Sequence, residues 1–224
     1  KHFNPDVAFD LTTGQVVTGM DAIRQAFVNQ LAAIKRVASE HMGGIPTLLG
    51  EFGIPFDLDD RAAYKTGDFS THVQALDAYY NAMDANLLNC TIWNYTADSS
   101  NARGDMWNDE DLSIFSRDQQ TDPQNINSGG RGLAAIARPY ARKVAGEPLR
   151  MHFDLPTRTF ELEFRHDPAV TAPTEIFVPD YQYPKGYVVE LSDGAYQIDH
   201  QALTLTVHHT LKQETHTVCI RPAS

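Results

Sequence analysis

The residue whose type and position best suit catalysis is Glu51, which follows a short apolar run at residues 45–50. Gly and Pro bound this run, a pattern typical of a buried parallel strand. In parallel α/β folds, functional side chains gather where strands end, because the loops that follow share one open face. Burial there can tune the pKa of a carboxylate, and Gly50 and Gly53 would let other groups approach closely. Glu51 is therefore a candidate catalytic carboxylate, although capping of a strand end or pairing with Arg or Lys would give the same pattern.

A second predicted strand, residues 89–95, ends in the same way, on Trp93, Asn94 and Tyr95. A Trp side chain at such a position is a flat apolar platform that suits the C–H face of a sugar ring. Sequence alone slightly favours the alternative, which is packing in the core. A loop of about 34 residues then runs from 96 to 129, and loops of that length inside a domain are usually functional or disordered.

This loop is rich in carboxylates and amides and also carries an aromatic side chain. Polyhydroxylated ligands need such groups, since each hydroxyl both donates and accepts hydrogen bonds. The candidate ligand-binding residues are Asp98, Arg103, Asp105, Trp107, Asn108, Asp109, Glu110 and Asp111. A solvated acidic surface and a metal site are the alternatives, but the regular spacing of a calcium loop is absent.

Metal and cofactor sites find little support elsewhere in the sequence. His208 and His209 are adjacent on a predicted strand, so their side chains would point to opposite faces and could not easily share a metal. Together with His200 and His216, we interpret them as surface histidines. The motifs of dinucleotide, nucleoside-triphosphate, structural-zinc and serine-hydrolase sites are missing as well. We therefore predict no cofactor and no metal.

The charge balance restricts the class of partner. The chain has 224 residues, with 18 Lys and Arg against 29 Asp and Glu, and a net charge of −11. Nucleic-acid affinity comes mainly from clustered Lys and Arg, so we expect no nucleic-acid partner, and an anionic membrane surface is disfavoured for the same reason. No apolar run reaches the roughly 18 residues of a membrane-spanning helix, so no transmembrane segment is predicted. Cys90 and Cys219 lie in apolar, strand-like contexts that suit buried thiols better than a disulfide.

The elements that must position these residues fall into two parts with different hydrophobic periods. Residues 1–146 form an α/β part in which helices alternate with the two strands above. The predicted helices span about 21–42, 71–87 and 130–145. Residues 147–224 instead contain about seven short strands at intervals of roughly 8–12 residues, which predicts an antiparallel β-sandwich. The fold class is thus α/β followed by all-β.

Four motifs occur in order along the chain. They are LGEFGIPFDL (49–58) with YKTGDF (64–69), IWNY (92–95), GDMWNDEDLSIFS (104–116), and GGR with ARPY (129–131 and 137–140). They resemble the seventh-strand end, eighth strand, active-site loop and last barrel helix of glycoside hydrolase family 5. The most similar branch contains glucosylceramidases, steryl β-glucosidases and endoglycoceramidase-related enzymes. An all-β C-terminal domain follows in that branch too, so the resemblance covers nearly the whole chain.

The resemblance implies a (β/α)8 TIM barrel, of which residues 1–146 would supply about strands 7 and 8. It also implies a retaining β-glycosidase for glucosides with hydrophobic aglycones, such as glucosylceramide or steryl glucoside. By motif, Glu51 would be the nucleophile that forms a covalent glycosyl-enzyme, and Trp93 would be the sugar platform. The further substrate-binding residues would be Asn94, Asp105, Trp107 and Asn108.

Only half of the expected carboxylate pair lies in this chain. The family's acid/base Glu follows an Asn after the fourth strand, and no Asn-Glu-Pro occurs here. A complete barrel takes about 250 residues, and a two-strand piece would expose both sheet edges. We therefore expect an N-terminal fragment of the same enzyme, as a second chain, to complete the barrel and supply the acid/base Glu.

A non-catalytic module is the alternative function. The β-sandwich would then bind a glycan or glycolipid, and the α/β part would be its scaffold. The aromatic residues available for such binding on the strand faces are Tyr181, Tyr183 and Tyr187, although packing at an edge strand would use them equally well.

Overall fold

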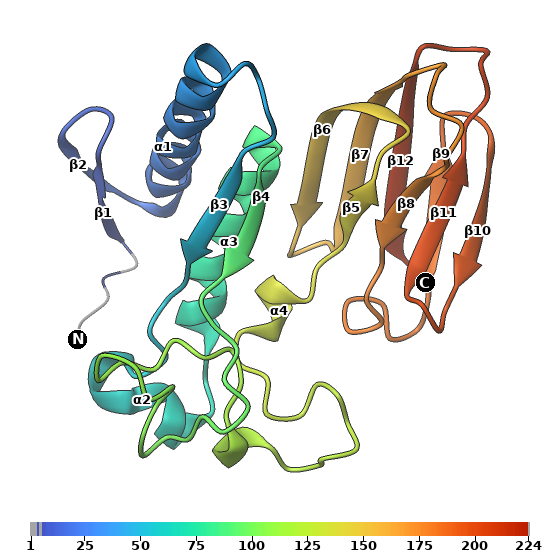
Figure 1. Cartoon of the computed structure of the whole chain (residues 1–224). Helices are drawn as coiled ribbons and strands as arrows, with labels where there is room; N and C mark the ends of the chain where they lie inside the picture. Colours follow the sequence, from blue (N-terminus) through green and yellow to red (C-terminus); the bar gives the residue numbers. More distant parts are fainter. Residues whose placement is uncertain (1–3, 5, 224) are drawn as a thin grey trace. The chain divides into compact units, whose positions relative to one another are not determined.

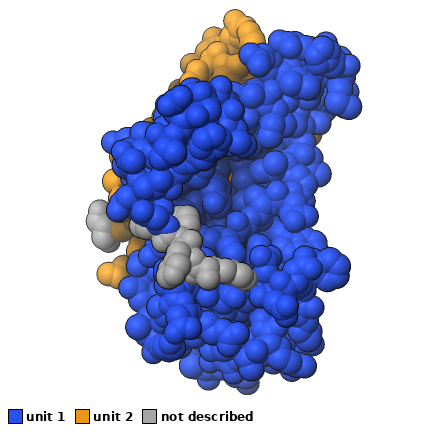
Figure 2. Space-filling view, turned by 90° about the vertical axis from the view of Figure 1, so that its left-hand side faces the viewer, with its two compact units in different colours: residues 1–136 blue, residues 137–224 orange. Residues whose placement is uncertain are grey.

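The computed structural model describes residues 4 and 6–223 (Figure 1). The chain divides into two compact units, residues 1–136 and 137–224, which Figure 2 distinguishes by colour. The division falls ten residues before Gly146, where the change of hydrophobic period is seen in the sequence. None of the described helices is both long enough and apolar enough to cross a membrane.

The first unit combines helices with two small sheets. Its elements are the hairpin of β1 (Val7–Asp10) and β2 (Gln15–Thr18), helix α1 (Met20–His41), strand β3 (Leu48–Phe52), helices α2 (Leu58–Thr66) and α3 (Ser70–Asn86), strand β4 (Asn89–Ile92), the short 3₁₀ helix η1 (Arg117–Gln119) and helix α4 (Leu133–Ile136). Helices α1 and α3 agree with the predicted spans because apolar residues recur there at helical spacing. The hairpin and α2 were not predicted.

Strands β3 and β4 are parallel, as expected from their apolar runs, and they lie side by side in Figure 1. Leu48 pairs with Asn89 and Phe52 with Ile92, with one irregularity between. Helix α3 packs on this sheet, since the ring centroids of Phe52 and Tyr80 are 5.2 Å apart. In the described part of the chain, β3 and β4 pair only with each other.

The predicted helix over residues 130–145 is wrong. Only the four residues of α4 are helical, and Tyr140–Lys143 form strand β5, which pairs with β8 (Thr174–Phe177). The Ala-rich run before Pro139 has a helix-like composition, but Pro has no N–H to continue a helix. This segment therefore passes into the second unit as a strand.

The second unit contains two four-stranded antiparallel sheets, in the orders β10-β11-β8-β5 and β6-β7-β12-β9. The remaining strands are β6 (Gly146–Asp154), β7 (Thr159–His166), β9 (Tyr187–Leu191), β10 (Ala195–Asp199), β11 (Thr204–His208) and β12 (Thr215–Pro222). All seven strands predicted beyond residue 146 are present.

Both sheets contribute to one hydrophobic core in this unit. Phe160, Leu162 and Phe164 of β7 are buried, as their alternation with charged residues predicts. Ile176 of β8 and Leu205 of β11 come from the other sheet and belong to the same core. A shared core between two antiparallel sheets is the arrangement of a β-sandwich. Cys90 in the first unit and Cys219 in the second are half-buried, and neither forms a disulfide within the described residues.

Candidate active site

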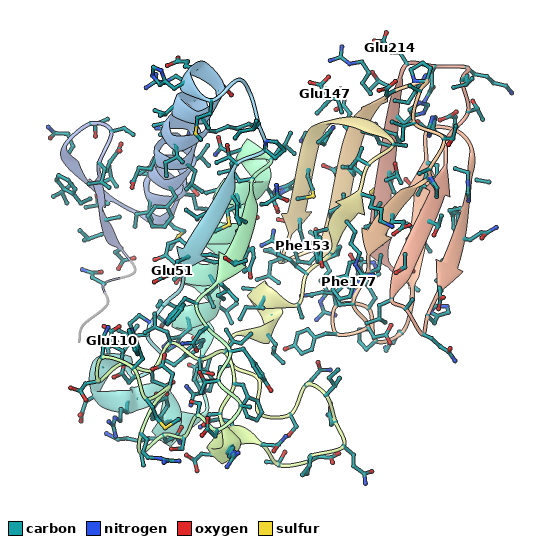
Figure 3. The ribbon with its side chains drawn as sticks, in the orientation of Figure 1. Glu51, Glu110, Glu147, Phe153, Phe177 and Glu214 are labelled. Atoms are coloured by element: carbon teal, nitrogen blue, oxygen red, sulfur yellow. The ribbon has the colours of Figure 1, made fainter. Side chains whose placement is uncertain are left out.

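The candidate site lies where β3 and β4 end together. Glu51 is the penultimate residue of β3, near its arrowhead in Figure 3. Trp93 directly follows β4, and its backbone N–H donates to the carbonyl of Phe52 at 2.7 Å. Parallel strands end at the same edge of a sheet, so the fold brings Glu51 and Trp93 to one edge.

The two glycines beside Glu51 differ in what surrounds them. A Cβ atom on Gly53 would lie 2.2 Å from the carbonyl oxygen of Trp93, so only glycine permits this approach of the two strand ends. A Cβ on Gly50 would have no described atom within 4 Å. The close approach that we predicted at both glycines is therefore present at Gly53 and absent at Gly50 in the described structure.

The Glu51 side chain is exposed. Within residues 4 and 6–223, its carboxylate has no hydrogen bond or ion pair. The alternative from sequence, an ion pair between Glu51 and an Arg or Lys side chain, is therefore not present among these residues. A carboxylate without such a partner keeps its oxygen lone pairs available for a ligand.

Asn94 and Asp105 meet directly. The amide Nδ2 of Asn94 donates to Oδ2 of Asp105 at 2.8 Å, and Asp105 is 6% exposed. The same carboxylate accepts the backbone N–H groups of Trp107 at 3.0 Å and Leu112 at 3.2 Å. Asp105 therefore closes the loop on itself and orients the Asn94 side chain beside Trp93.

Trp107 and Asn108 lie on a tight turn of the loop. The N–H of Glu110 donates to the carbonyl of Trp107 at 3.0 Å, and Asn108 and Asp109 have positive φ angles of 49° and 55°. Trp107 is 58% exposed, which is unusual for a large aromatic side chain without a ligand or partner. The turn thus displays both predicted binding residues.

Other predicted loop residues gather elsewhere. Arg103, Asp109, Glu110 and Asp111 line a polar cavity of about 270 Å³, together with Tyr64 of α2. Figure 3 places Glu110 beside α2. This group does not include Asp105 or Asn108, so the loop's polar residues form two separate sets.

A buried ion pair fixes the base of the loop, and the sequence analysis did not find it. Arg131 is 0% exposed, and its Nη1 donates to Oδ2 of Asp111 at 2.6 Å. The guanidinium also donates to Gln119 at 3.0 Å and to Asn101 at 3.3 Å. Each contact joins a different part of the long loop, so Arg131 ties the loop together from inside.

Tyr64 completes this network from α2. Its hydroxyl donates to Asp111, and the Arg131 guanidinium carbon lies 5.0 Å from the centre of its ring. Burial, followed by the hydrogen bond and negative charge of Asp111, raises the pKa of Tyr64. Tyr64 therefore stays protonated and acts as a donor. The sequence does show Arg131 next to glycines at the end of an acidic loop, which could have suggested an ion pair. It does not show which of the loop's carboxylates Arg131 pairs with.

The far part of the loop, residues 121–128, folds largely on itself. The hydroxyl oxygen of Ser128 accepts the N–H groups of Thr121 at 2.9 Å and Asp122 at 3.0 Å. Ile126 between them is 97% exposed. This tip is thus a local turn, separate from the ion pair at the loop's base.

The histidines of the second unit are not all at the surface. His216 is 2% exposed and lies with His209 and His166, so our interpretation of it as a surface histidine is wrong. His208 is exposed, as expected. The sequence analysis did not single out His166, because it lies 50 residues from His216, and only strand pairing brings the two together.

Comparison with known proteins places these features in a context. Residues 138–220 match the glycoside hydrolase family 5 C-terminal domain. A glucosylceramidase of Rhizopus delemar is 33% identical over 178 residues, which are 74% of this chain and 26% of that protein. The ergosteryl-beta-glucosidase of Saccharomyces cerevisiae is 29% identical, over 91% of this chain and 33% of that protein.

Solved structures agree with these relatives. Sterylglucosidase 1 of Cryptococcus neoformans superposes with a TM-score of 0.87 at 30% identity, over 97% of this chain and 34% of that one. Endo-glycoceramidase II from Rhodococcus sp. shares the fold, with a TM-score of 0.62 at 23% identity. The chain spans about a quarter to a third of the length of the curated relatives named above.

Proposed function

This chain belongs to glycoside hydrolase family 5, and from that premise we propose that it is the C-terminal part of a retaining β-glucosidase. The proposed substrates are glucosides with a hydrophobic aglycone, such as glucosylceramide or a steryl glucoside. The names of its relatives support this class, since they include a glucosylceramidase and an ergosteryl-beta-glucosidase. The observation that carries the proposal is the exposed carboxylate of Glu51, which has no partner among the described residues and lies beside Trp93 at the end of two parallel strands.

In the proposed mechanism, Glu51 is the nucleophile. Its carboxylate oxygen attacks the anomeric carbon of glucose while the bond from that carbon to the aglycone oxygen breaks. A second carboxylic acid, about 5–5.5 Å away in retaining enzymes, gives its proton to the departing oxygen. Water then attacks the glycosyl-enzyme, restoring Glu51 and releasing glucose with its original configuration.

The surrounding residues would bind and orient the sugar. The face of Trp93 would pack on the C–H groups of the glucose ring. Asn94 would present its amide to a sugar hydroxyl, held in place by the hydrogen bond to Asp105. Trp107 and Asn108, displayed on their turn, would contact the sugar or the aglycone from the loop. Asp105 would act mainly as a positioning residue, because the groups that hold the loop occupy both of its oxygens.

We further propose that β3 and β4 are the last two strands of a (β/α)8 barrel, completed by an N-terminal portion of the same enzyme. Leu48 of β3 is 58% exposed, and Ile34 and Val37 on α1 are 47% and 51% exposed. An apolar cavity of about 300 Å³ lies beside them, lined in part by Leu49 and Phe52. Neighbouring strands and helices of a barrel would cover such surfaces. The acid/base Glu would come from that portion.

The alternative, a binding module in the second unit, loses its proposed binding surface. Tyr183 is only 3% exposed, and its hydroxyl donates to the carbonyl of Arg158 at 3.0 Å. Its ring centroid lies 5.4 Å from that of Tyr187. These two rings therefore pack within the unit. Of the three candidate tyrosines, only Tyr181, at 39% exposed, presents its side chain to solvent.

Labelling with a 2-deoxy-2-fluoro glucoside tests the proposal. The enzyme assembled from this chain and the N-terminal portion is incubated with the reagent, and the modified peptide is mapped by mass spectrometry. We expect a single label on Glu51, none in Glu51→Gln, and normal labelling in the control Glu147→Gln, which changes an exposed carboxylate of the second unit. A label on another carboxylate, or turnover without any label at Glu51, would contradict the assignment.

A further inference from the structure

Three imidazole side chains converge at one end of the second unit. The proposed glycosidase mechanism uses none of them. His166 is the last residue of β7, His209 directly follows β11, and His216 is the second residue of β12. One nitrogen from each ring lies within 4.8 Å of the others. His166 also donates its backbone N–H to the carbonyl of Glu214 at 3.1 Å, and Glu214 is labelled at this end in Figure 3.

The fold holds these rings together through strand pairing and two close approaches. In the β7–β12 ladder, His216 is opposite Phe164, which brings it near the end of β7. A Cβ atom on Gly194 would lie 2.1 Å from the carbonyl oxygen of His208, and one on Gly146 would lie 2.2 Å from that of Arg165. Both positions therefore require glycine, and both set the backbone beside one of the three histidines.

A carboxylate orients the buried histidine. Nδ1 of His216 and Oδ1 of Asp193 are 2.5 Å apart, and Thr210 donates its N–H and its hydroxyl to the other oxygen of Asp193. Both groups of Thr210 are donors, so Asp193 acts as an acceptor throughout this network. Because a carboxylate can only accept, Nδ1 of His216 carries a proton. In the neutral ring, Nε2 then has a lone pair directed at the cluster.

The other two rings face the same space. Nδ1 of His166 lies 2.9 Å from Nε2 of His216, so in the neutral cluster one proton bridges these atoms. Nδ1 of His209 is buried and has no hydrogen-bond partner among the described residues. In the neutral tautomer that has its proton on Nε2, this Nδ1 atom offers a lone pair to a cation.

We propose that His166, His209 and His216 form a binding site for a divalent transition-metal ion, with zinc as the best match. Imidazole nitrogens suit Zn²⁺, Co²⁺, Ni²⁺ and Cu²⁺, whereas Mg²⁺ and Ca²⁺ prefer oxygen ligands. Asp193 supplies the carboxylate that commonly orients a metal-bound histidine. His166 and His209 are half-buried, so a fourth position on the metal stays open to water.

The geometry needs only small movements to accept the ion. Zinc–nitrogen bonds of about 2.0–2.1 Å in a tetrahedral site separate two ligand nitrogens by roughly 3.3 Å. The present separations run from 2.9 Å to at most 4.8 Å, so they bracket this value. The metal would take the place of the bridging proton, and that proton would move from Nδ1 to Nε2 of His166. A neutral cluster would therefore bind the metal ion without a net release of protons.

Metal titration of the full, untagged chain after chelator treatment tests the site. We expect one Zn²⁺ per chain by calorimetry, and Co²⁺ should give the visible absorption of a four- or five-coordinate site. His209→Ala and His166→Ala should each weaken binding by at least 100-fold. The matched control His208→Ala, an exposed neighbour on the same strand end, should bind normally. Asp193→Asn should weaken binding by about 10–100-fold.

The outcomes separate a metal site from a structural histidine cluster. Circular dichroism identifies the variants that fold. If His209→Ala does not fold, the affinity comparison uses His166→Ala. Absence of stoichiometric Zn²⁺ binding would overturn the proposal, as would unchanged affinity in both ligand variants or an equal loss in His208→Ala. Because binding is the readout, failure of this site would leave the role of Glu51 untouched.

Discussion

The two units stabilise their functional features in different ways. In the first unit, a parallel pair of short strands and a long loop depend on polar side chains, above all the buried Arg131–Asp111 pair. In the second, two sheets share an apolar core, and ion pairs such as Arg150–Glu161 lie across the exposed faces of the strands. A site built on loops thus depends on specific buried charges, whereas strand pairing and close backbone approaches hold the histidine cluster of the sandwich, with one carboxylate orienting it.

The chain carries a built-in reporter for this contrast. Both of its tryptophans, Trp93 and Trp107, belong to the first unit. Tryptophan fluorescence therefore follows unfolding of the first unit alone, while far-ultraviolet circular dichroism reports the helices of the first unit and the strands of the second together.

The largest expected effect is that of Glu51→Gln on catalysis. Loss of the nucleophilic carboxylate should lower the rate by about a thousand-fold or more, which corresponds to at least about 4 kcal/mol in the activation barrier. Both unfolding signals should be unchanged, since Glu51 is exposed and the substitution is nearly isosteric. The rate is measured on a steryl or ceramide glucoside with the assembled enzyme. Activity within tenfold of the original would refute the assignment.

Arg131→Met should destabilise the first unit alone. It leaves the Asp111 carboxylate buried without its cation, which typically costs about 3–5 kcal/mol. The fluorescence midpoint in urea should fall, and the helical part of the dichroism should fall with it, while the part contributed by the second unit's strands keeps its original midpoint. Arg103→Met, at an exposed position, is the control and should change little. If the strand part of the dichroism shifts as well, the units unfold as one and the contrast fails.

Leu162→Ala is the reciprocal change in the second unit. Leu162 is 1% exposed in the shared core, and such truncations typically cost about 2–5 kcal/mol. Here the dichroism transition should move and the fluorescence transition should not. Val188→Ala, in the same sheet but 48% exposed, should cost about 0.5 kcal/mol or less. An equal effect of the two substitutions would argue against the shared core.

The smallest effect concerns acidification of the first unit. Burial lowers the pKa of His72, and the charge of Arg131 adds to this, although a backbone hydrogen bond to Pro55 and the charges of Asp59 and Asp68 act in the opposite direction. Below its ordinary pKa of about 6.5, the unfolded chain takes up a proton that the folded unit does not, so stability falls as pH decreases. Urea midpoints by fluorescence at pH 7.5 and 5.5 should show this loss.

A matched pair of substitutions isolates the contribution of His72. Its ring stacks on Phe56 with centroids 5.0 Å apart, so His72→Phe keeps the packing and removes the titration. The pH dependence of the first unit should flatten in this variant and persist in His200→Gln, an exposed position of the second unit. An unaltered slope in His72→Phe would assign the effect to other groups.

The elements that sequence predicted well are those with a strong hydrophobic period. The β-strands after residue 146 follow from alternation such as that of Phe160, Leu162 and Phe164, and α1 and α3 follow from helical spacing. The failure at 130–145 arose because an Ala-rich run resembles a helix, whereas pairing of β5 with β8 decides its structure. Local composition carries no information about such a distant partner.

Site prediction shows the same limit. Glu51 and Trp93 could be placed at one sheet edge because parallel strands share their direction. The partner of Arg131 could not be predicted in this way, because the loop contains several carboxylates and only the folded backbone brings Asp111 to Arg131. The sequence does not reveal the histidine cluster. The neighbours His208 and His209 point to opposite faces, whereas the pairing of β7 with β12 brings His166 and His216 together.

The self-contained tip of the long loop has a practical consequence for engineering. Residues 121–128 fold around Ser128, and the Arg131 contacts lie outside this segment, at Asn101, Asp111 and Gln119. Exposed tips of this kind tolerate insertion and cleavage best. A fluorophore or affinity handle at Ile126 would therefore mark the loop while leaving its anchoring charges in place.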